Sequence, residues 1–378
     1  MKVVMVGPYP EPGAAVSGGV ERVIDSLLPH LAERVDLTLV VPGAMSDSSS
    51  RKFGVDIHYL KRGFGPGALR SSTFDAQKLA CLVNSLKPDL IHLQGIAGFS
   101  RFINTPKVLT IHGIAHQDLL LSSRGDRWGQ TVKRGAVAFL KRTERSARKR
   151  MDGIIVINPY VKEALPDIEL IKNWSIPNPL SEHFICKNRA FKKKKICRLI
   201  SIGRITPLKN TLGIIEICEQ VIKSDPAVEL VICGSGGASD YEYQCRAFVS
   251  QKNLEGSVKF VGNLSTELLI SNLDQSSVLI MSSRQENSPM AIAEANARGV
   301  PVVAPKEFGI KYMIEEGENG FFLPNTDIIS NSHVLKRALV YPWKRHDIAR
   351  SAADRYSPQA VVEATLSAYA EVLARPAG

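Results

Sequence analysis

The chain has 378 residues, 44% of them hydrophobic and 22% charged, which is enough for two globular domains with separate cores. No apolar run approaches the roughly 20 residues of a membrane span, and the apolar start at 1–6 is too short for a signal peptide, so we expect a cytoplasmic protein. The net charge of +11 suits anionic ligands, acidic membrane surfaces or nucleic acid. Six cysteines without a Cys-x-x-Cys pair predict buried free thiols rather than disulfides or zinc.

Alternating strands and helices in the first half predict a doubly wound α/β domain over residues 1–182. Strands are expected at 2–6, 37–41, 55–60, 90–93, 108–111 and 153–157, and helices at 20–33, 73–86 and 131–150. Gly18 and Gly19 come directly before the first helix and would let backbone approach a phosphate closely. His112 follows the strand at 108–111, which places it on the ligand edge of the sheet. His116 has no third metal ligand nearby, so satisfied loop histidines are the default.

The segment 133–150 combines a basic face with an apolar stripe. It holds eight basic residues and one acidic residue, Glu144. As a helix it fits docking on an anionic membrane surface. An equally open interpretation is a packed helix whose charged face is solvated. Nucleic acid is a third option, but no recognised binding module accompanies the charge.

A second α/β domain is predicted over residues 196–355. Prolines at 176–179 and the lysine-rich tract at 186–195 separate it from the first domain and indicate a solvated linker. Its strands are expected at 198–202, 229–233, 258–261, 277–281 and 300–304, and its helices at 212–224, 241–252, 266–273, 289–298 and 330–340. The last helix, 358–375, is expected to pack back on the first domain.

Three strand-to-helix loops of this second domain carry residues suited to phosphate or base recognition. Arg204 and Lys209, after the first strand, could together neutralise a diphosphate. Gly234 and Gly236, after the second, let backbone N–H groups approach a phosphate or sugar. The exposed backbone of 261–263, after the third, could pair with a base edge. Parallel strands bring these loops to one edge of the sheet.

The fourth such loop leads into the helix at 289–298. Ser288 is its predicted N-cap, Pro289 suits its first turn and Gly299 suits its end. Glu286 then lies in the loop and Glu294 in the helix, an arrangement that suits a ligand with both hydroxyls and phosphate. Taken alone, the pair could equally be one solvated glutamate and one cap-region glutamate. Four such loops on successive strands of one domain favour a ligand crevice.

The constellation resembles the retaining glycosyltransferases of family 4, whose GT-B fold has two facing Rossmann-like domains with a cleft between them. The most specific elements are Glu286 to Glu294 with the trailing 299–303, and Gly203-Arg204 with Lys209. The resemblance implies that Glu294 holds the ribose hydroxyls of a nucleotide sugar and Glu286 a hydroxyl of the transferred sugar. Arg204 and Lys209 would bind the diphosphate and stabilise it as it leaves.

The resemblance also implies that His112 lies beside the transferred sugar. Further donor contacts would come from Gly18, Gly19, Gly234, Gly236, Val261, Asn263, Asn287, Ser288 and Met290. Asn287-Ser288-Pro289 stands where Gly-Phe-Gly often follows the first glutamate, a departure that bears on sugar specificity. The chain has no Asp-x-Asp, so neither a metal nor another cofactor is expected.

The favoured function is transfer of a sugar from a nucleotide diphosphate donor, UDP rather than GDP, to a lipid-linked cell-surface glycan. Retention would follow from attack on the face that the leaving group vacates, with a phosphate oxygen accepting the acceptor's proton. Alternatives are a nucleotide-sugar epimerase of the same architecture and a non-catalytic nucleotide-sugar-binding protein. A glycosidase ranks lower because one of the paired carboxylates sits mid-helix beside a phosphate-type site.

Overall fold

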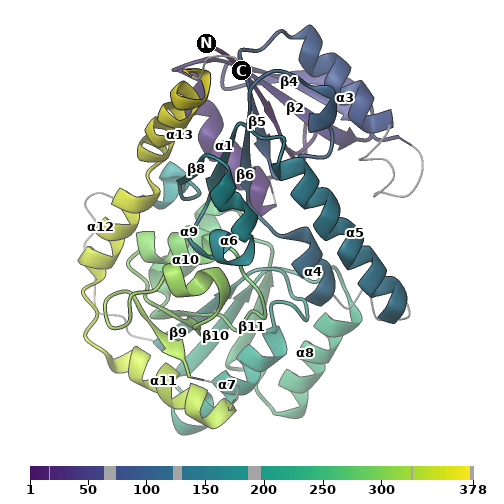
Figure 1. The fold of residues 1–378 in the computed structure, drawn as a ribbon. Coiled ribbons are helices and arrows are strands. Elements are labelled where there is room, and N and C mark those ends of the chain that lie inside the picture. The colour runs from purple at the N-terminus through teal and green to yellow at the C-terminus, as the bar shows by residue number, and fades with distance from the viewer. Residues whose placement is uncertain (17, 64–73, 122–129, 186–196, 325–326, 375–378) are drawn as a thin grey trace. The chain divides into compact units, whose positions relative to one another are not determined.

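The computed structural model describes residues 1–16, 18–63, 74–121, 130–185, 197–324 and 327–374. These residues form two compact units, each built on a sheet of its own (Figure 1). The first unit takes its described residues from Met1–Leu120, Trp128–Ser181 and Tyr356–Gly378, and the second takes its sheet and helices from Glu182–Arg355. The tract predicted as a linker, 186–195, lies outside the described residues.

An eight-stranded sheet in the order β3-β4-β2-β1-β5-β6-β7-β8 forms the centre of the first unit. Its strands are β1 Lys2–Val6, β2 Asp36–Ala44, β3 Ser48–Lys52, β4 Val55–Lys61, β5 Leu90–Gln94, β6 Lys107–Ile111, β7 Gly153–Val156 and β8 Asn173–Ser175. Its helices are α1 Gly19–Ala32, α3 Phe74–Ser85, α4 Ala115–Leu121, α5 Gln130–Arg148, α6 Tyr160–Ala164 and α13 Pro358–Leu373, with short 3-10 turns at Ser100–Phe102 and Pro166–Leu170.

All neighbouring strands of this sheet are parallel except β3 and β4. Strand β1 lies between β2 and β5, so the strand order reverses there, and the loops after β1, β5 and β6 open on one edge. The apolar run at the start of the chain is buried on both faces, as central parallel strands are. Helix α13 belongs to the same unit, where its Tyr369 is fully buried and lies 2.5 Å from His92 Nδ1.

The second unit has a six-stranded, wholly parallel sheet in the order β11-β10-β9-β12-β13-β14. Its strands are β9 Cys197–Ile202, β10 Val228–Cys233, β11 Val258–Gly262, β12 Val278–Ile280, β13 Val302–Pro305 and β14 Gly320–Leu323. Its helices are α7 Thr211–Ser224, α8 Asp240–Gln251, α9 Thr266–Gln275, α10 Met290–Ala297, α11 Ile328–Val340 and α12 Arg345–Tyr356, with 3-10 turns at Glu182–Phe184 and Phe308–Tyr312. This is the predicted doubly wound architecture.

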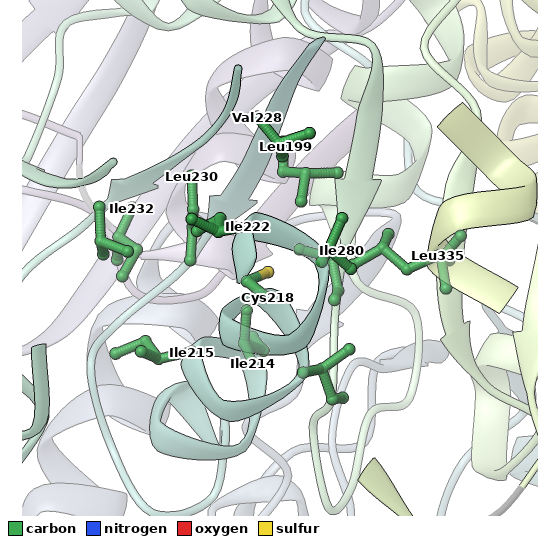
Figure 2. Close-up of a cluster of buried hydrophobic side chains, with 14 of the residues drawn as sticks. Leu199, Ile214, Ile215, Cys218, Ile222, Val228, Leu230, Ile232, Ile280 and Leu335 are labelled. Carbon is green, nitrogen blue, oxygen red and sulfur yellow. The ribbon is translucent and has the colours of Figure 1, made fainter. Parts of the chain in front are cut away.

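The core of the second unit lies between helix α7 and the central strands (Figure 2). Apolar residues of α7 recur on one stripe, and Ile214, Ile215 and Cys218 from that stripe belong to the same buried cluster as Leu230 of β10. Leu335 of α11 extends the same cluster and has no exposed surface. This packing fixes the strands whose loops carry the candidate site.

Several expectations from the sequence need correction. Strands β3, β8 and β14 were not expected, because their apolar signals are short or interrupted, and helix α12 was not expected although buried apolar residues recur along it. Of the five cysteines that the structure describes, all free, three are buried as predicted, whereas Cys81 is exposed and Cys197 partly so. His116 was expected in a loop but lies in helix α4, where its Nδ1 is 2.6 Å from Glu144 Oε2.

Replacing Leu335 by alanine is expected to lower the free energy of unfolding of the second unit by about 2–5 kcal/mol, because it leaves a cavity in a close-packed core. Leu268→Ala is the matched control: Leu268 is exposed in the same unit, and its loss should change stability by less than about 0.5 kcal/mol. Urea unfolding followed by far-ultraviolet circular dichroism measures both. Equal effects of the two substitutions would contradict this core.

Candidate functional site

The strand order of the second unit reverses between β9 and β12. From β9 the chain proceeds through β10 to β11 on one side, and β12 to β14 fill the other side. In open α/β sheets, ligands bind outside the carboxyl ends of the strands at such a reversal. The loops that follow β9, β10, β11 and β12 therefore meet at one edge, as predicted from the spacing of the strands.

An ion pair between Lys209 and Glu286 joins the loops on the two sides of this reversal. Glu286 is 9% exposed, so its charge is held largely away from water beside a cation. Two further contacts join the same loops: Arg284 N donates to Leu208 O at 2.8 Å, and Asn210 Nδ2 donates to Ser282 Oγ at 3.0 Å. The β9 and β12 loops thus form one connected structure.

Arg204 lies in the same β9 loop and is exposed. Arg204 and Lys209 both border a small void of about 10 Å³ beside this loop, together with Met281 and Ser283. That space is about the size of one water molecule, so what the structure shows is that the two predicted cations share one loop. The backbone of Glu286 also receives a hydrogen bond from Gly309 N at 2.9 Å, which attaches the loop after β13 to the same place.

Helix α10 carries the second glutamate. Glu294 is only 2% exposed, so the interpretation of a solvated glutamate is wrong. The predicted N-cap is also wrong by one residue: α10 begins at Met290 with Pro289 as its N-cap, while Ser288 Oγ lies 3.7 Å from Met313 Sδ. Gly299, with φ of +66°, follows the end of the helix as predicted.

Asn287, Ser288 and Met290 are all partly buried where the β12 loop enters this helix. A helix N-terminus favours negative charge nearby, and these three residues lie at the start of α10. They stand directly beside Glu286 in the chain, and the helix they introduce carries Glu294.

The glycine loop after β10 touches the β9 loop through backbone. A Cβ added at Gly234, whose φ is +136°, would lie 1.9 Å from Gly203 O. Gly203 N donates to Cys233 O at 2.9 Å, and Gly234 N donates to Gly262 O at 2.7 Å, which joins the β11 loop as well. Val261 and Asn263, on either side of Gly262, are exposed.

The backbone N–H group of Gly236 already has a hydrogen-bond partner, whereas the sequence suggested that it would be open to a ligand. It donates to Glu242 Oε2 at 2.7 Å, and Arg246 and this N–H group lower the pKa of Glu242. A carboxylate of helix α8 thus occupies the backbone donor that was predicted to meet a phosphate.

The remaining predicted site residues lie in the first unit, at the carboxyl edge of its own sheet. Gly18 is the N-cap of α1, and its N–H donates to Glu21 Oε2 at 2.9 Å, while Gly19 is exposed. His112 follows β6, and its Nε2 lies 2.6 Å from Gln94 Oε1. Burial lowers the pKa of His112 to about 4. At neutral pH its imidazole is therefore uncharged.

Sequence reasoning missed three residues that shape these edges. Asn210, with φ of +53°, and Ser282 connect the β9 and β12 loops, and Gln94 holds His112. Gln94 was detectable in principle, because it directly follows the predicted strand 90–93 at the ligand edge. The other two depend on contacts between loops 72 residues apart, which no local pattern reports.

No three His, Cys, Asp or Glu side chains among the described residues gather as a metal site would require. No helix that the structure describes combines the length and apolarity needed to cross a bilayer.

Comparison with known families identifies the chain. Residues 17–180 match the model described as Glycosyltransferase Family 4, and residues 183–355 match the one described as Glycosyl transferases group 1. Together the two matches span nearly the whole chain. The chain belongs to glycosyltransferase family 4. Both matched models describe glycosyltransferases, the class of protein that the resemblance implied.

Each of the individual relatives matches less than half of the chain. The amylovoran biosynthesis glycosyltransferase AmsK of Erwinia amylovora is 30% identical over 146 residues, which are 37% of this chain and 35% of AmsK. The match thus spans about a third of the length of this relative. Family membership of the present glycosyltransferase rests on the two domain matches.

Solved structures share its fold. Sucrose-phosphate synthase from Thermosynechococcus elongatus has a TM-score of 0.77 at 16% identity, covering 98% of this chain and 99% of that one. Anabaena HepE in complex with UDP and glucose has a TM-score of 0.71 at 18% identity, with the same two coverages. At these identities the likeness concerns the fold alone, and it confirms the predicted GT-B architecture of the glycosyltransferase.

Replacing Gly234 by alanine is expected to lower the free energy of unfolding by more than about 2 kcal/mol, because the new Cβ would meet backbone in a conformation that favours glycine. Gly256→Ala is the matched control: Gly256 lies in the same unit with no atom within 4 Å of an added Cβ and no positive φ. Thermal unfolding of both variants tests this. A Gly234→Ala protein as stable as the control would mean that the β9 and β10 loops do not touch.

Proposed function

We propose that this glycosyltransferase moves a hexosyl group from a UDP-sugar to a lipid-linked saccharide of a cell-surface glycan. The observation that carries the proposal is the Lys209–Glu286 ion pair at the strand reversal of the second unit, with Arg204 exposed in the same β9 loop as Lys209. Two cations beside a carboxylate provide charge for a diphosphate and an acceptor for sugar hydroxyl groups.

The proposed roles follow from where charge develops. Glycosyl transfer builds positive charge on the anomeric carbon and negative charge on the departing diphosphate. Arg204, Lys209 and the N-terminus of α10 would stabilise the diphosphate, while Glu286 binds a hydroxyl of the transferred sugar and Glu294 binds the ribose. The backbone at Val261 and Asn263 would meet the base, and His112 would lie beside the transferred sugar.

The proposed bond changes need no protein nucleophile. The bond from the anomeric carbon to the diphosphate oxygen breaks, and the electron pair leaves with the diphosphate. The acceptor oxygen then bonds to the anomeric carbon on the same face, and its proton passes to a phosphate oxygen. Configuration at the anomeric carbon is retained, in line with the family.

Two observations support the choice of donor and acceptor. HepE, which shares the fold, was solved with UDP and glucose, and this favours UDP over GDP. AmsK is named for the biosynthesis of a polysaccharide, amylovoran, and this favours a glycan acceptor. A lipid carrier would place the enzyme on the inner face of the cytoplasmic membrane.

Helix α5 supports docking on such a membrane. Its side chains Val132 and Phe139 are 59% and 50% exposed, which is unusual for large apolar residues and typical of helices that insert into a lipid interface. Exposed cations accompany them: Arg134, Lys141, Arg142 and Arg145. Anionic headgroups are the partner that this combination fits.

The proposed donor site predicts that UDP-sugars raise the melting temperature of the protein more than GDP-sugars do. In Glu294→Ala, affinity for UDP and its sugars should fall by about tenfold or more, because charged hydrogen bonds to the ribose are lost. A thermal-shift panel followed by isothermal titration calorimetry measures this, with the exposed Glu318→Ala as control. Unchanged donor affinity in a folded Glu294→Ala protein would remove Glu294 from the ribose site.

Turnover of the best donor with extracted lipid-linked saccharides then tests the reaction itself. Transfer to the saccharide supports the proposal. Release of a free epimerised sugar without acceptor would favour the epimerase, and binding without turnover would favour a non-catalytic role.

The proposed docking of helix α5 on a membrane predicts a second result. Lys141→Gln/Arg142→Gln should weaken binding to phosphatidylglycerol-containing vesicles by about 10- to 30-fold, since each neutralised cation near the surface costs about 1 kcal/mol. Lys61→Gln/Arg62→Gln removes an exposed Lys-Arg pair elsewhere in the first unit and serves as the matched control. Vesicle co-sedimentation measures both. An equal effect of the two double substitutions would point to net charge rather than α5.

A further inference from the structure

Helix α5 is fixed to the first unit mainly at its C-terminal end. Of its residues 131–148, whose side chains the structure describes, only Ala147 and Arg148 are buried. Arg148 donates to both carboxylate oxygens of Asp167, at 2.9 and 3.0 Å, which holds that end in place. An amphipathic helix of a globular protein normally buries its apolar stripe. The earlier turns of α5 leave theirs only partly covered.

A cavity of about 270 Å³ lies beneath these turns, between α5 and the sheet. Its apolar lining includes Leu109 and Ile111 of β6, Ile114 of the following loop, and Phe139 and Leu140 of α5. A water molecule takes up about 30 Å³ of the liquid, so the cavity has room for about nine groups of that size. Moving an apolar group from water into such a cavity is favourable. The cavity therefore suits a short stretch of an apolar chain.

Two arginines border the same cavity. Arg101, in the turn after β5, and Arg150, shortly after α5, are both exposed. A guanidinium has five N–H groups, and Arg150 Nη1 donates to Ser146 O at 3.0 Å. The acidic residue in the lining, Glu144, accepts a hydrogen bond from Ala115 N at 2.9 Å, so part of its charge is already used. The charge available to a ligand is positive, which suits a phosphate group.

The cavity also reaches the ligand edge of the first sheet. Gly95 and Gly113 belong to its lining, and they lie in the loops that follow β5 and β6. These loops stand at the carboxyl ends of parallel strands, where α/β sheets bind ligands. A membrane lipid that only anchors α5 need not reach this edge. The lipid carrier of an acceptor has to reach it, because it brings the saccharide to the site of transfer.

We propose that the cavity under α5 binds the lipid carrier of the acceptor. The apolar chain would lie between α5 and β6, and the phosphate that joins chain and saccharide would bind Arg101 and Arg150. The inference rests on the proposed function, which assigns a lipid-linked saccharide as the acceptor, and it adds the residues that recognise the lipid part. Helix α5 thereby has two tasks: it attaches to the membrane and it takes the carrier out of it.

Calorimetric titration of the full chain with farnesyl diphosphate tests the site, with UDP present to occupy the proposed donor site. Farnesol lacks the phosphate, inorganic diphosphate lacks the chain, and dihexanoyl-phosphatidylglycerol represents a membrane phospholipid. We expect farnesyl diphosphate to bind at least about tenfold more tightly than each of the three, because chain burial and charged hydrogen bonds both contribute. Equal affinity for farnesol or diphosphate would overturn a site with two parts. Equal affinity for the phospholipid would overturn the choice of a carrier.

A substitution that fills the cavity tests where the chain binds. Leu140→Trp should lower the affinity for farnesyl diphosphate about tenfold or more, because the larger ring takes the space of the chain. Val132→Trp adds the same ring on the same helix at an exposed position outside the lining, and it should leave the affinity unchanged. Thermal unfolding shows that both variants fold. Equal affinities of the two folded variants would overturn the placement of the chain.

The arginines are tested separately, and both are exposed, so this test holds if Leu140→Trp does not fold. Arg101→Gln and Arg150→Gln should each lower the affinity for farnesyl diphosphate about fivefold or more and leave that for farnesol unchanged, because each removes a charged hydrogen bond to phosphate. Arg142→Gln is the matched control, since Arg142 is exposed on α5 outside the lining. An equal loss in all three variants would mean attraction by net charge and would overturn the phosphate contact.

Turnover separates failure of this site from failure of the proposed function. With extracted lipid-linked saccharides, Leu140→Trp should raise the KM for acceptor about tenfold or more, while the KM for donor changes less than about threefold. If the unsubstituted enzyme uses these acceptors and Leu140→Trp leaves the acceptor KM unchanged, the site is overturned and the function stands. If farnesyl diphosphate binds as expected but no lipid-linked saccharide is glycosylated, the proposed acceptor is wrong and the cavity remains a site for a prenyl phosphate.

Discussion

The ion pair between Lys209 and Glu286 is the contact on which the rest of the second unit's site depends. A carboxylate as deeply buried as Glu286 would be strongly destabilising without a cation, so the pair fixes the two loops that carry it against each other. The backbone bonds from Arg284 to Leu208 and from Gly309 to Glu286 extend the connection to the loop after β13. In the proposed reaction a diphosphate would supply a second anionic partner for Lys209, so the pair keeps the cation in place before the donor binds.

A similar electrostatic preference is seen at two backbone N–H groups of the loops at the sheet edges. Gly18 N at the start of α1 and Gly236 N after β10 each bind a carboxylate, from Glu21 and Glu242. Both are positions at which the sequence indicated phosphate contacts, and both hold an anionic oxygen in this structure. Exposed N–H groups near helix starts favour negative charge, so the anion-binding character of the loops is visible without a ligand. A phosphate at either position would have to displace or share that carboxylate.

The sequence predicted those strands and loops that depend on residues close to one another in the chain. The apolar runs of β9 to β13 and the glycines in the loops that follow were sufficient to predict that these loops gather at one edge of the sheet. The N-cap at Ser288 failed because Pro289, already extended, takes that place. Strand β3 was missed because its Ser-rich edge is largely exposed, whereas α12 did carry a signal, since Ile348, Ala352 and Tyr356 recur every fourth residue and are buried. The burial of Glu294 and the contact of Gln94 with His112 depend on residues distant in sequence, which no periodicity encodes.

The two units differ in how they handle charge, and the proposed chemistry gives a physical reason. The second unit gathers Arg204 and Lys209, where negative charge would grow on the leaving diphosphate. The first unit presents His112, a buried imidazole that stays neutral at physiological pH. Positive charge would grow on the anomeric carbon during transfer, so an imidazolium beside the sugar would oppose the reaction, while a neutral ring with a lone pair would not. His112 contacts Gln94, and His92 contacts Tyr369 of α13, so packing at this edge removes water from both rings and lowers the pKa of each.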